Sequence, residues 1–480
     1  MPPVGASIPL TQDPLYDDLD PDHKNVSFVS MYNNGGIDQG PQHVYCSTNI
    51  NYTQYCCPDG KSSSCVINGV EVYNWMHYVT NDAFSFNGKR YNRLDPYLAL
   101  ATQYGWANYM FQTNQGPSMP AHQFLLSGTS AQTAPPNTLF AAENPGKNVY
   151  ENDTGCTALA GETVNIIDPS GSEDYTPIYP CFDHNTLTDL LDNASHGWKY
   201  YSNTTGSIWT APNAIQHICL PTSPVDGTCQ GKDWLNDVLP YVGTGKVLTD
   251  LGVGGSSNSA CQLPAVSWVI PDGNWSDHAG LSSNGNAFGP AWVGDIVDAV
   301  GGYDNTGTKL PIQCNYWQNT AILITWDDWG GWYDHVEPFK ILLNTQNNPC
   351  TVWGCGYTYG FRVPFMFVSA YTPQGFVSGT VNLQNTTNCT DPQHCYDFGS
   401  ILQFIELNFG LGKIAGVPNQ YADYFAKPLD PAFYSGQFRQ FQAIPTPVPP
   451  NCFINPKAQG CIPNYTGPVD PDDDGSEPTN

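Results

Sequence analysis

The segment 320–336 constrains the possible folds of this chain more than any other part of the sequence. It opens with Ala321 to Thr325, a short run of apolar and β-branched residues that predicts a buried strand. The run gives way to Asp327 and Asp328, which are followed closely by two glycines. Because an open α/β sheet binds ligands at the carboxyl ends of its strands, this order predicts an α/β fold with a site at this point.

The two adjacent acids, Asp327 and Asp328, admit two interpretations. Two carboxylates cannot leave water side by side unless a cation or a proton lies between them. A hard or borderline metal ion is the simplest such cation. In the alternative interpretation, the acids belong to a polar loop and both are solvated. The stretch alone leaves both interpretations open.

Predicted helices and strands alternate between residues 94 and 411. The sequence predicts helices at 94–104, 120–127, 187–198, 233–242, 288–300 and 397–411, and strands at 106–111, 265–270, 321–325 and 362–369. This alternation predicts a mostly parallel central sheet sandwiched between helices. Long cysteine-bearing loop insertions complete the prediction: residues 128–182 with strands at 138–141 and 163–167, and an irregular region 1–90 with short strands such as 26–31.

Two further polar groups follow predicted strands. Ser118 lies between the strand 106–111 and a helix whose first turn contains Pro120. The start of a helix favours a negatively charged oxygen, but without further context a simple helix cap is the favoured interpretation of Ser118. Asp277 and His278 follow the strand 265–270 and repeat the pattern of a strand followed by ligands. Their alternative interpretation is an ordinary surface loop pair.

The composition excludes some partners and indicates a compartment. The formal charge is −27, with 16 Lys plus Arg and no basic stripe, so we expect no nucleic-acid partner and repulsion from anionic membranes. The 16 cysteines lack zinc-finger spacing, which favours disulfides in an oxidising compartment. N-glycosylation sequons agree with a secreted glycoprotein; they lie at Asn25, Asn51, Asn152, Asn193, Asn203, Asn274, Asn385, Asn388 and Asn464.

The two ends of the chain carry their own predictions. The first ten residues lack the basic start and the apolar core typical of a signal peptide. The sequence also lacks an apolar run of about 18 residues, so it predicts no transmembrane helix. We therefore expect a mature or shortened form of a secreted protein. Residues 1–443 are predicted to form one α/β domain, and residues 444–480 a proline-rich linker with an acidic, disordered tail. The oligomeric state stays open.

Three segments, taken in chain order, resemble a known family. They are Gln-Gly-Pro-Ser-Met-Pro at 115–120, Ser-Asp-His at 276–278, and Thr-Trp-Asp-Asp-Trp-Gly-Gly-Trp-Tyr-Asp-His-Val at 325–336. Together they resemble the phosphoesterase family of bacterial-type phospholipases C and acid phosphatases, within the alkaline-phosphatase-like superfamily. The resemblance covers roughly residues 5–440. It implies an alkaline-phosphatase-like fold and hydrolysis of phosphoric esters.

The resemblance also implies a nucleophile and a metal site. Ser118 matches the family's nucleophile, which attacks phosphorus and contacts the metal, and Asp327 and Asp328 match its metal-binding acids. A metal-bound serine oxygen loses its proton near neutral pH, and the cation stabilises charge on the phosphoryl oxygens. One divalent ion is therefore expected. Two carboxylates and a serine oxygen admit Ca, Mg, Mn or Zn.

Further residues receive roles near the phosphate. Asp277 and His278 match an Asp-His pair of the family, in which His278 would protonate the leaving alkoxide and Asp277 would orient it. His335 and His122 are additional candidates for a direct role. The alternative interpretation of each histidine is that it orients a ligand or caps a turn.

One departure from the family pattern is serious. Members of the family open with a buried strand followed by a Glu-Asn pair that completes the metal site, and this sequence contains no such segment. The chain begins in the loop region near residues 7–10. We therefore expect either a shortened form or a member with an incomplete site. Loss of a central strand would also expose an edge of the sheet.

Three functions follow from these patterns. The first is a secreted, metal-dependent hydrolase of phosphoric esters, acting on a phospholipid or another phosphoester through a phosphoseryl intermediate. The second is a catalytically impaired relative, a secreted glycoprotein whose Trp326, Trp329 and Trp332 bind lipid headgroups or sugars. The third is a related hydrolase such as a sulfatase, which the absence of a Cys-x-Pro-x-Arg sequence disfavours.

Overall fold

The structure is a computed structural model of the whole chain. It describes residues 11–15, 23–32, 65–67, 70–72, 77–130, 140–141, 143–145, 154–167, 173–255, 260–278, 288–339, 358–379, 394–415, 421–463 and 465. Several predictions fall outside these residues, among them the acidic tail after residue 465 and the sequons at Asn51, Asn152, Asn385, Asn388 and Asn464.

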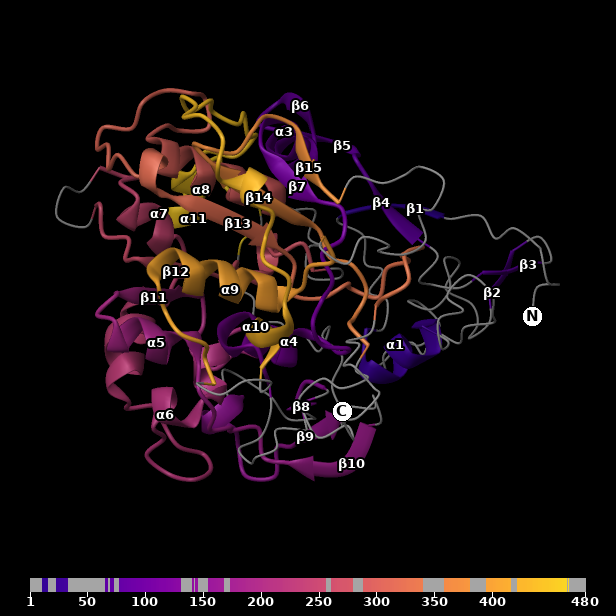
Figure 1. Cartoon of the computed structure of the whole chain (residues 1–480). Coiled ribbons are helices and arrows are strands. Elements are labelled where there is room, and N and C mark those ends of the chain that lie inside the picture. The colour runs from indigo at the N-terminus through magenta and orange to yellow at the C-terminus, as the bar shows by residue number, and fades with distance from the viewer. Residues whose placement is uncertain are drawn as a thin grey trace.

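Two groups of strands form the centre of the molecule (Figure 1). The larger is a four-stranded sheet in the order β13 (Ala321–Thr325), β14 (Phe365–Ser369), β7 (Gly105–Ala107) and β15 (Phe376–Ser378). In it β14 runs antiparallel to β13 and β7, whereas β15 is parallel to β7. The smaller group is the parallel pair of β11 (Trp198–Tyr201) and β12 (Val266–Val269). The α/β class is confirmed, but these strands do not form the single, mostly parallel sheet that the sequence predicts.

Helices lie on both faces of these strands. One face is covered by α3 (Asp95–Gln103), α7 (Lys246–Asp250) and α8 (Gly289–Gly301), and the other by α4 (Ser118–Ser127), α9 (Phe398–Phe409) and α10 (Ala422–Phe425). Alternate residues of β13 belong to different clusters: Ile322 and Ile324 join the α8 cluster, and Leu323 joins the α9 cluster. In β12, Val269 joins the α8 cluster and Trp268 the α9 side. Both strands therefore lie in one layer between the same helices.

Smaller elements surround this centre. Pairs are formed by β1 (Thr11–Pro14) with β4 (His77–Thr80), β2 (Cys65–Ile67) with β3 (Val70–Val72), and β5 (Ala83–Phe86) with β6 (Lys89–Asn92). A separate antiparallel sheet contains β8 (Phe140–Ala141), β9 (Val164–Ile167) and β10 (Glu173–Ile178), and the remaining short helices are α5 (Leu187–Asn193), α6 (Gln216–Cys219) and α11 (Asn451–Ile454). The predicted strands in the insertion 128–182 thus correspond to β8 and β9.

Helix α9 confirms the predicted element at 397–411. Asp397 caps its start in a capping box with Ser400, which satisfies backbone donors of the first turn. Gly410 ends it with φ of +66°, a left-handed conformation that glycine adopts without steric cost. Local capping chemistry therefore sets both ends of this helix.

Three predicted elements differ from the structure. The predicted strand at 26–31 is instead helix α1 (Asn25–Tyr32), because Phe28, Met31 and Tyr32 recur at helical spacing and are buried together. The predicted helix at 187–198 ends at Asn193, and Trp198 begins β11. The predicted helix at 233–242 consists of a π turn and a 3-10 turn, and the second contains Pro240, which lacks a backbone N–H.

Disulfide bonds cross-link the loops, as the sequence predicts. The described bonds are Cys156–Cys181, Cys219–Cys229, Cys261–Cys314 and Cys452–Cys461, and no described cysteine is free.

Beyond residue 443, Ile444, Val448 and Phe453 are fully buried in the same cluster as α8. The segment predicted as a linker therefore packs on the domain between residues 444 and 463. No helix in the described part of the chain is long and apolar enough to cross a bilayer.

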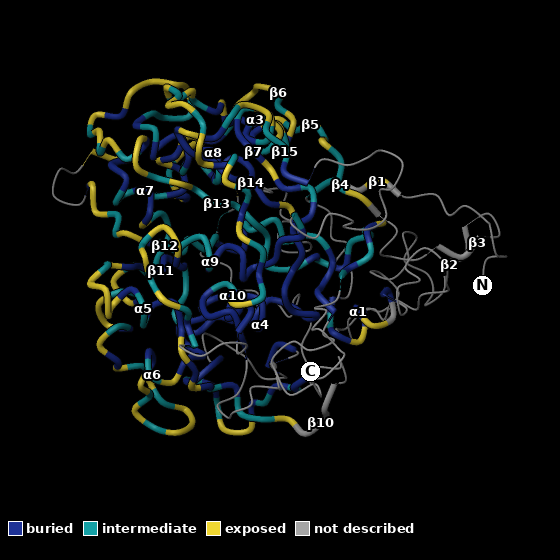
Figure 2. The backbone as a smooth tube through the Cα atoms, viewed as in Figure 1, coloured by how far each residue is buried: buried dark blue, intermediate teal, exposed yellow. Residues whose placement is uncertain are grey.

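The two strands that carry the predicted site are less buried than the sequence suggests. Ala321 is exposed and the other four residues of β13 are half-buried, and three of the four residues of β12 are also half-buried (Figure 2). The strand at 321–325 is confirmed, but its predicted burial is wrong. The reason is that β12 and β13 each border a cleft that lies between them.

Candidate active site

Ser118 is the first residue of helix α4 and is 1% exposed. Its hydroxyl donates a hydrogen bond of 3.3 Å to Oδ2 of Asp328. The start of the helix is held by Asn144, whose side-chain oxygen accepts the backbone N–H of Met119. The structure therefore joins two of the predicted site residues, which are far apart in sequence, at a position where the helix dipole favours negative charge.

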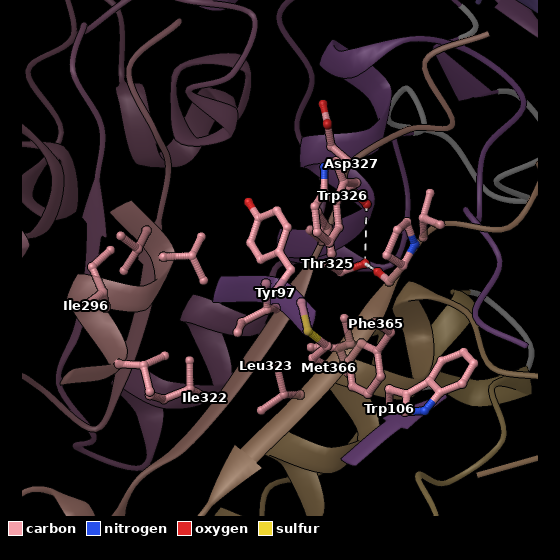
Figure 3. Close-up of a pocket in the computed structure, with 18 of the residues that line it drawn as sticks. Tyr97, Trp106, Ile296, Ile322, Leu323, Thr325, Trp326, Asp327, Phe365 and Met366 are labelled. Atoms are coloured by element: carbon pink, nitrogen blue, oxygen red, sulfur yellow. Dashed lines mark hydrogen bonds between the residues drawn. The ribbon is translucent and has the colours of Figure 1, made fainter. Parts of the chain in front are cut away.

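The turn after β13 fixes the acid pair, of which Asp327 is seen in Figure 3. Oδ1 of Asp328 accepts the backbone N–H of Gly330 at 2.6 Å. Gly330 and Gly331 have φ of +62° and +71°, which side-chain-bearing residues adopt only at a cost. The two glycines thus let the chain reverse and fold back on Asp328. The side chain of Asp327 is 27% exposed and that of Asp328 only 7%.

Each acid has a histidine beside it. Nε2 of His122, one turn along α4 from Ser118, lies 3.2 Å from Oδ2 of Asp327. Nε2 of His23 lies 3.9 Å from Oδ2 of Asp328, and His23 is 1% exposed. His122 was a sequence candidate, whereas His23 was not, because it lies in a polar loop with no motif to mark it. The sequence offers no signal for it, because the helix α1 that follows His23 was itself predicted as a strand.

Asp277 and His278 are turned in different directions. The Asp277 carboxylate accepts a 2.6 Å hydrogen bond from the Tyr97 hydroxyl, and burial raises the pKa of Asp277 to about 7. Its φ of +68° is a left-handed conformation. The His278 ring lies 5.7 Å from that of His23 and 6.3 Å from that of Trp209. His278 therefore lies beside His23, which is next to Asp328, while the described hydrogen bonds of Asp277 lead to Tyr97 and Trp326 rather than to the His278 ring.

His335 lies at the edge of the site. Its side chain is half-exposed, and its ion-pair contact is with Asp334, 3.7 Å away, rather than with either acid of the pair. Asp334 is itself held by Arg362, whose Nε and Nη2 donate to the two carboxylate oxygens at 2.8 and 2.7 Å. This fork anchors the end of the glycine turn. Its place in the structure gives His335 access to solvent and to the cleft.

The tryptophans of the motif have separate environments. Trp329 is 5% exposed and packs against Phe28 and His23, so it belongs to a small core. Trp326 is half-buried and meets the Tyr97 ring edge-on at 5.1 Å. All three tryptophans line the cleft. Trp326 and Trp332 are half-buried and have more surface available to a ligand than the buried Trp329.

The oxygen donors at this site suit a hard cation, but they are fewer than such an ion requires. Ser118, Asp327 and Asp328 supply three oxygen groups, whereas a divalent ion takes at least four ligands. Within the described residues, no group of three or more His, Cys, Asp or Glu side chains is placed to hold a metal. Oxygen donors on two convergent carboxylates fit Ca, Mg, Mn or Zn in kind, and the remaining positions belong to water, phosphate or a further group.

Comparison with known proteins identifies the family. A model of the phosphoesterase family matches residues 20–412. The chain belongs to the phosphoesterase family. This confirms the resemblance carried by the segments at 115–120, 276–278 and 325–336, and it places Ser118, Asp327 and Asp328 within the matched region.

Curated relatives carry the name phospholipase C. Non-hemolytic phospholipase C of Burkholderia pseudomallei is 27% identical over 262 residues, which cover 49% of this chain and 33% of that protein. Phospholipase C A of Mycobacterium tuberculosis is 25% identical over 346 residues, which cover 64% of this chain and 57% of that protein. Hemolytic phospholipase C of Pseudomonas aeruginosa is 23% identical, covering 66% and 38%. The matched region thus spans from a third to just over half of these relatives.

Among solved structures, the 2-O GAG sulfatase BT1596 covers 72% of this chain with 11% identity and a TM-score of 0.29. A likeness of this size adds nothing to the description of the fold.

Proposed function

We propose that this member of the phosphoesterase family hydrolyses phosphoric esters with Ser118 as the nucleophile. The single observation that carries the proposal is the hydrogen bond from the Ser118 hydroxyl to Oδ2 of Asp328 at the start of helix α4. A serine is a weak nucleophile unless a neighbouring group accepts its proton or lowers its pKa. Asp328 stands where such a group is needed, and the helix start favours the developing charge.

In the first step of the proposed reaction, Oγ of Ser118 attacks phosphorus and its proton passes to Asp328. The bond between phosphorus and the leaving oxygen breaks, and His278 donates a proton to that oxygen. A water molecule then attacks the phosphoserine and gives a proton to His278. The bond between phosphorus and Oγ of Ser118 breaks, and Asp328 returns its proton to that Oγ. The proximity of His278 to His23, itself beside Asp328, supports its position within reach of a phosphate bound there.

We infer that Ser118, Asp327 and Asp328 hold one divalent cation, of Ca, Mg, Mn or Zn type. Such a cation supplies positive charge that stabilises the phosphoryl oxygens and lets an acidic protein bind an anionic substrate. The protein's own part is to fix the acids: His122 contacts Asp327, His23 contacts Asp328, and the glycine turn holds Asp328 from its other side.

The substrate class is a phosphoester or phospholipid, in a secreted and N-glycosylated protein. The names of the curated relatives support a phospholipid substrate, and a phosphate monoester is the alternative.

A second candidate function is binding without turnover. The observation that favours it is the short donor set, because three oxygen groups alone leave a cation incompletely held.

Hydrolysis of a chromogenic phosphocholine diester and of a chromogenic phosphate monoester tests the proposal. Each is assayed with added divalent metals and with chelator, in the parent chain, in Ser118→Ala and in Ser127→Ala. Ser127 is the matched control, because it lies on the same helix and its hydroxyl bonds to the Gln123 carbonyl of that helix. Turnover that needs metal and Ser118 but not Ser127 supports the proposal. Unchanged turnover in Ser118→Ala contradicts it, and retention of phosphocholine without turnover supports binding.

A further inference from the structure

The 444–465 segment packs on the loop that carries His278. This segment lies outside the region that matches the phosphoesterase family, which ends at residue 412. Helix α11 brings the ring of Phe453 edge-on to that of Trp275 at 5.2 Å, and the ring of Tyr465 stacks on Trp275 at 5.8 Å. Trp275 is 2% exposed and belongs to the loop of residues 271–278. Two aromatic rings of the segment therefore rest on the loop three residues before His278.

A buried carboxylate joins the segment to the start of this loop. The Tyr465 hydroxyl donates a hydrogen bond of 3.2 Å to Oδ2 of Asp272. Oδ1 of Asp272 accepts the backbone N–H and the side-chain amide of Asn274, at 2.9 and 2.6 Å, and Asp272 is fully buried. Donors to both oxygens fix the orientation of a carboxylate, and hydrogen bonds to an ionised group are the stronger ones. Tyr465 is therefore tied to the turn that begins the loop.

Hydrogen bonds within the loop continue from this turn to His278. The Ser276 hydroxyl donates to the Gly273 carbonyl at 3.3 Å and accepts the backbone N–H of His278 at 3.0 Å. Between them, Asp277 has φ of +68°, a left-handed conformation that a side-chain-bearing residue keeps only when its surroundings fix it. Tyr97 holds Asp277 from the α3 side. The loop is thus held at its end by α3 and at its start by the 444–465 segment.

The segment has anchors of its own on the domain. Its Cys452–Cys461 disulfide closes a short loop. Figure 1 shows α11 beside α7, and the Phe453 carbonyl oxygen lies so close to Gly245, just before α7, that a Cβ on this glycine would be 2.7 Å away. The segment is therefore placed independently of the loop and can act as a support for it.

We propose that Tyr465 is a positioning residue for the proposed reaction, because it holds the 271–278 loop so that His278 stays within reach of the leaving oxygen. This inference rests on the proposed function. In the alternative, the segment only covers apolar surface, and then the ring of Tyr465 matters but its hydroxyl does not. The hydrogen bond of that hydroxyl to Asp272 favours positioning.

Hydrogen exchange without substrate is the first test, and its result does not depend on the hydrolysis assay. Tyr465→Phe keeps the ring on Trp275 and removes only the hydroxyl. We expect amide exchange in 272–278 to become about fivefold faster in this variant, the loss of one hydrogen bond, with exchange in α8 unchanged. Tyr179→Phe is the matched control, since the half-buried Tyr179 donates to the Ala158 carbonyl at 2.6 Å rather than to this loop. Unchanged exchange in 272–278 of Tyr465→Phe would overturn the proposal.

Kinetics with two esters is the second test. Tyr465→Phe should lower kcat for an alkyl phosphoester by about fivefold, leave KM unchanged and hardly affect a nitrophenyl ester, whose leaving group needs little protonation. Tyr179→Phe should match the parent chain. An equal loss with both esters, an effect on KM alone, or an unchanged kcat for the alkyl ester would overturn the proposal. A His278→Ala variant that loses equally on both esters would instead contradict the proposed function, and the exchange result then decides alone whether Tyr465 orders the loop.

Discussion

Tyr97 of helix α3 donates a 2.6 Å hydrogen bond to Oδ2 of Asp277 in the loop after β12. The two residues lie 180 positions apart in sequence, and the bond links a helix to the loop that carries His278. Burial raises the pKa of Asp277 to about 7, and the hydrogen bond from Tyr97 opposes that rise. The same carboxylate raises the pKa of Tyr97 well above its ordinary value, after the larger effect of burial. Tyr97 therefore favours the ionised form of Asp277, as does the hydrogen bond from Trp326.

Replacing Tyr97 should shift the pH dependence of activity. Tyr97→Phe removes the donor that stabilises the Asp277 carboxylate, so the pKa of Asp277 should rise further. If ionised Asp277 is the active form, the acid limb of the kcat/KM profile moves to higher pH by about one unit. Pre-steady-state or steady-state rates between pH 4 and 9 measure this shift. An acid limb that stays in place would remove Asp277 from the reaction.

His278 should act on the leaving group. Protonation matters most when the departing oxygen is strongly basic, so His278→Ala should slow hydrolysis of an alkyl phosphoester by about 10²–10⁴-fold. A nitrophenyl ester, whose leaving group needs little protonation, should lose much less. The ratio of the two rates is the measurement.

His335→Ala is the comparison for that experiment. Because the His335 side chain is half-exposed and contacts Asp334, we expect both esters to be affected equally in this variant. A loss confined to the alkyl ester in His335→Ala, with His278→Ala unaffected, would transfer the proton-donating role to His335.

His122 should support cation binding through Asp327. The contact of 3.2 Å between His122 and Asp327 orients a carboxylate that we assign to the metal. Loss of such a supporting residue typically costs about 10–100-fold in metal affinity or activity. Titration of Mn²⁺ by calorimetry should therefore show weaker binding in His122→Ala. His217→Ala is the control, since His217 pairs with Asp183 and Asp189 at a distant surface. Equal affinity in all three proteins would contradict the assignment.

Buried acids should make the protein less stable as the pH rises. Asp298 in α8 accepts the Ile444 N–H at 2.7 Å, and burial raises its pKa to about 8. A carboxyl whose pKa is higher in the folded protein holds its proton more tightly there, so unfolding becomes easier between about pH 4 and pH 8. Urea unfolding at several pH values should show this decline. Asp298→Asn, which cannot ionise, should flatten the decline, and an unchanged slope would show that Asp298 ionises freely.

The helix ends and the site motifs were predictable because their signals are local. Asp397 and Gly410 carry the chemistry of a helix start and end, and the structure places the ends of α9 there. The glycines at 330 and 331 likewise mark the turn after β13. Ser118 and Asp328 were assigned to one site from the family pattern, and the structure brings them within hydrogen-bond distance.

Contacts between distant segments were not predictable in the same way. Nothing near His23 or Tyr97 marks them as neighbours of the site, because each is placed by the packing of another element. The half-burial of β13 was also missed, since an apolar run indicates what a strand could bury and not which neighbours are present. The predicted strand at 26–31 is wrong because Phe28, Met31 and Tyr32 follow a helical spacing that becomes clear only from what they pack against.

The central claim, that Ser118 is the nucleophile, is tested most directly by trapping its phosphorylated form. The enzyme is mixed with a chromogenic phosphate monoester, quenched in acid within one turnover, digested and analysed by mass spectrometry. We predict one added phosphate on the peptide that contains Ser118, and none in Ser118→Ala, which should also lack turnover. Turnover with no phosphate on Ser118, together with activity in Ser118→Ala, would contradict the account.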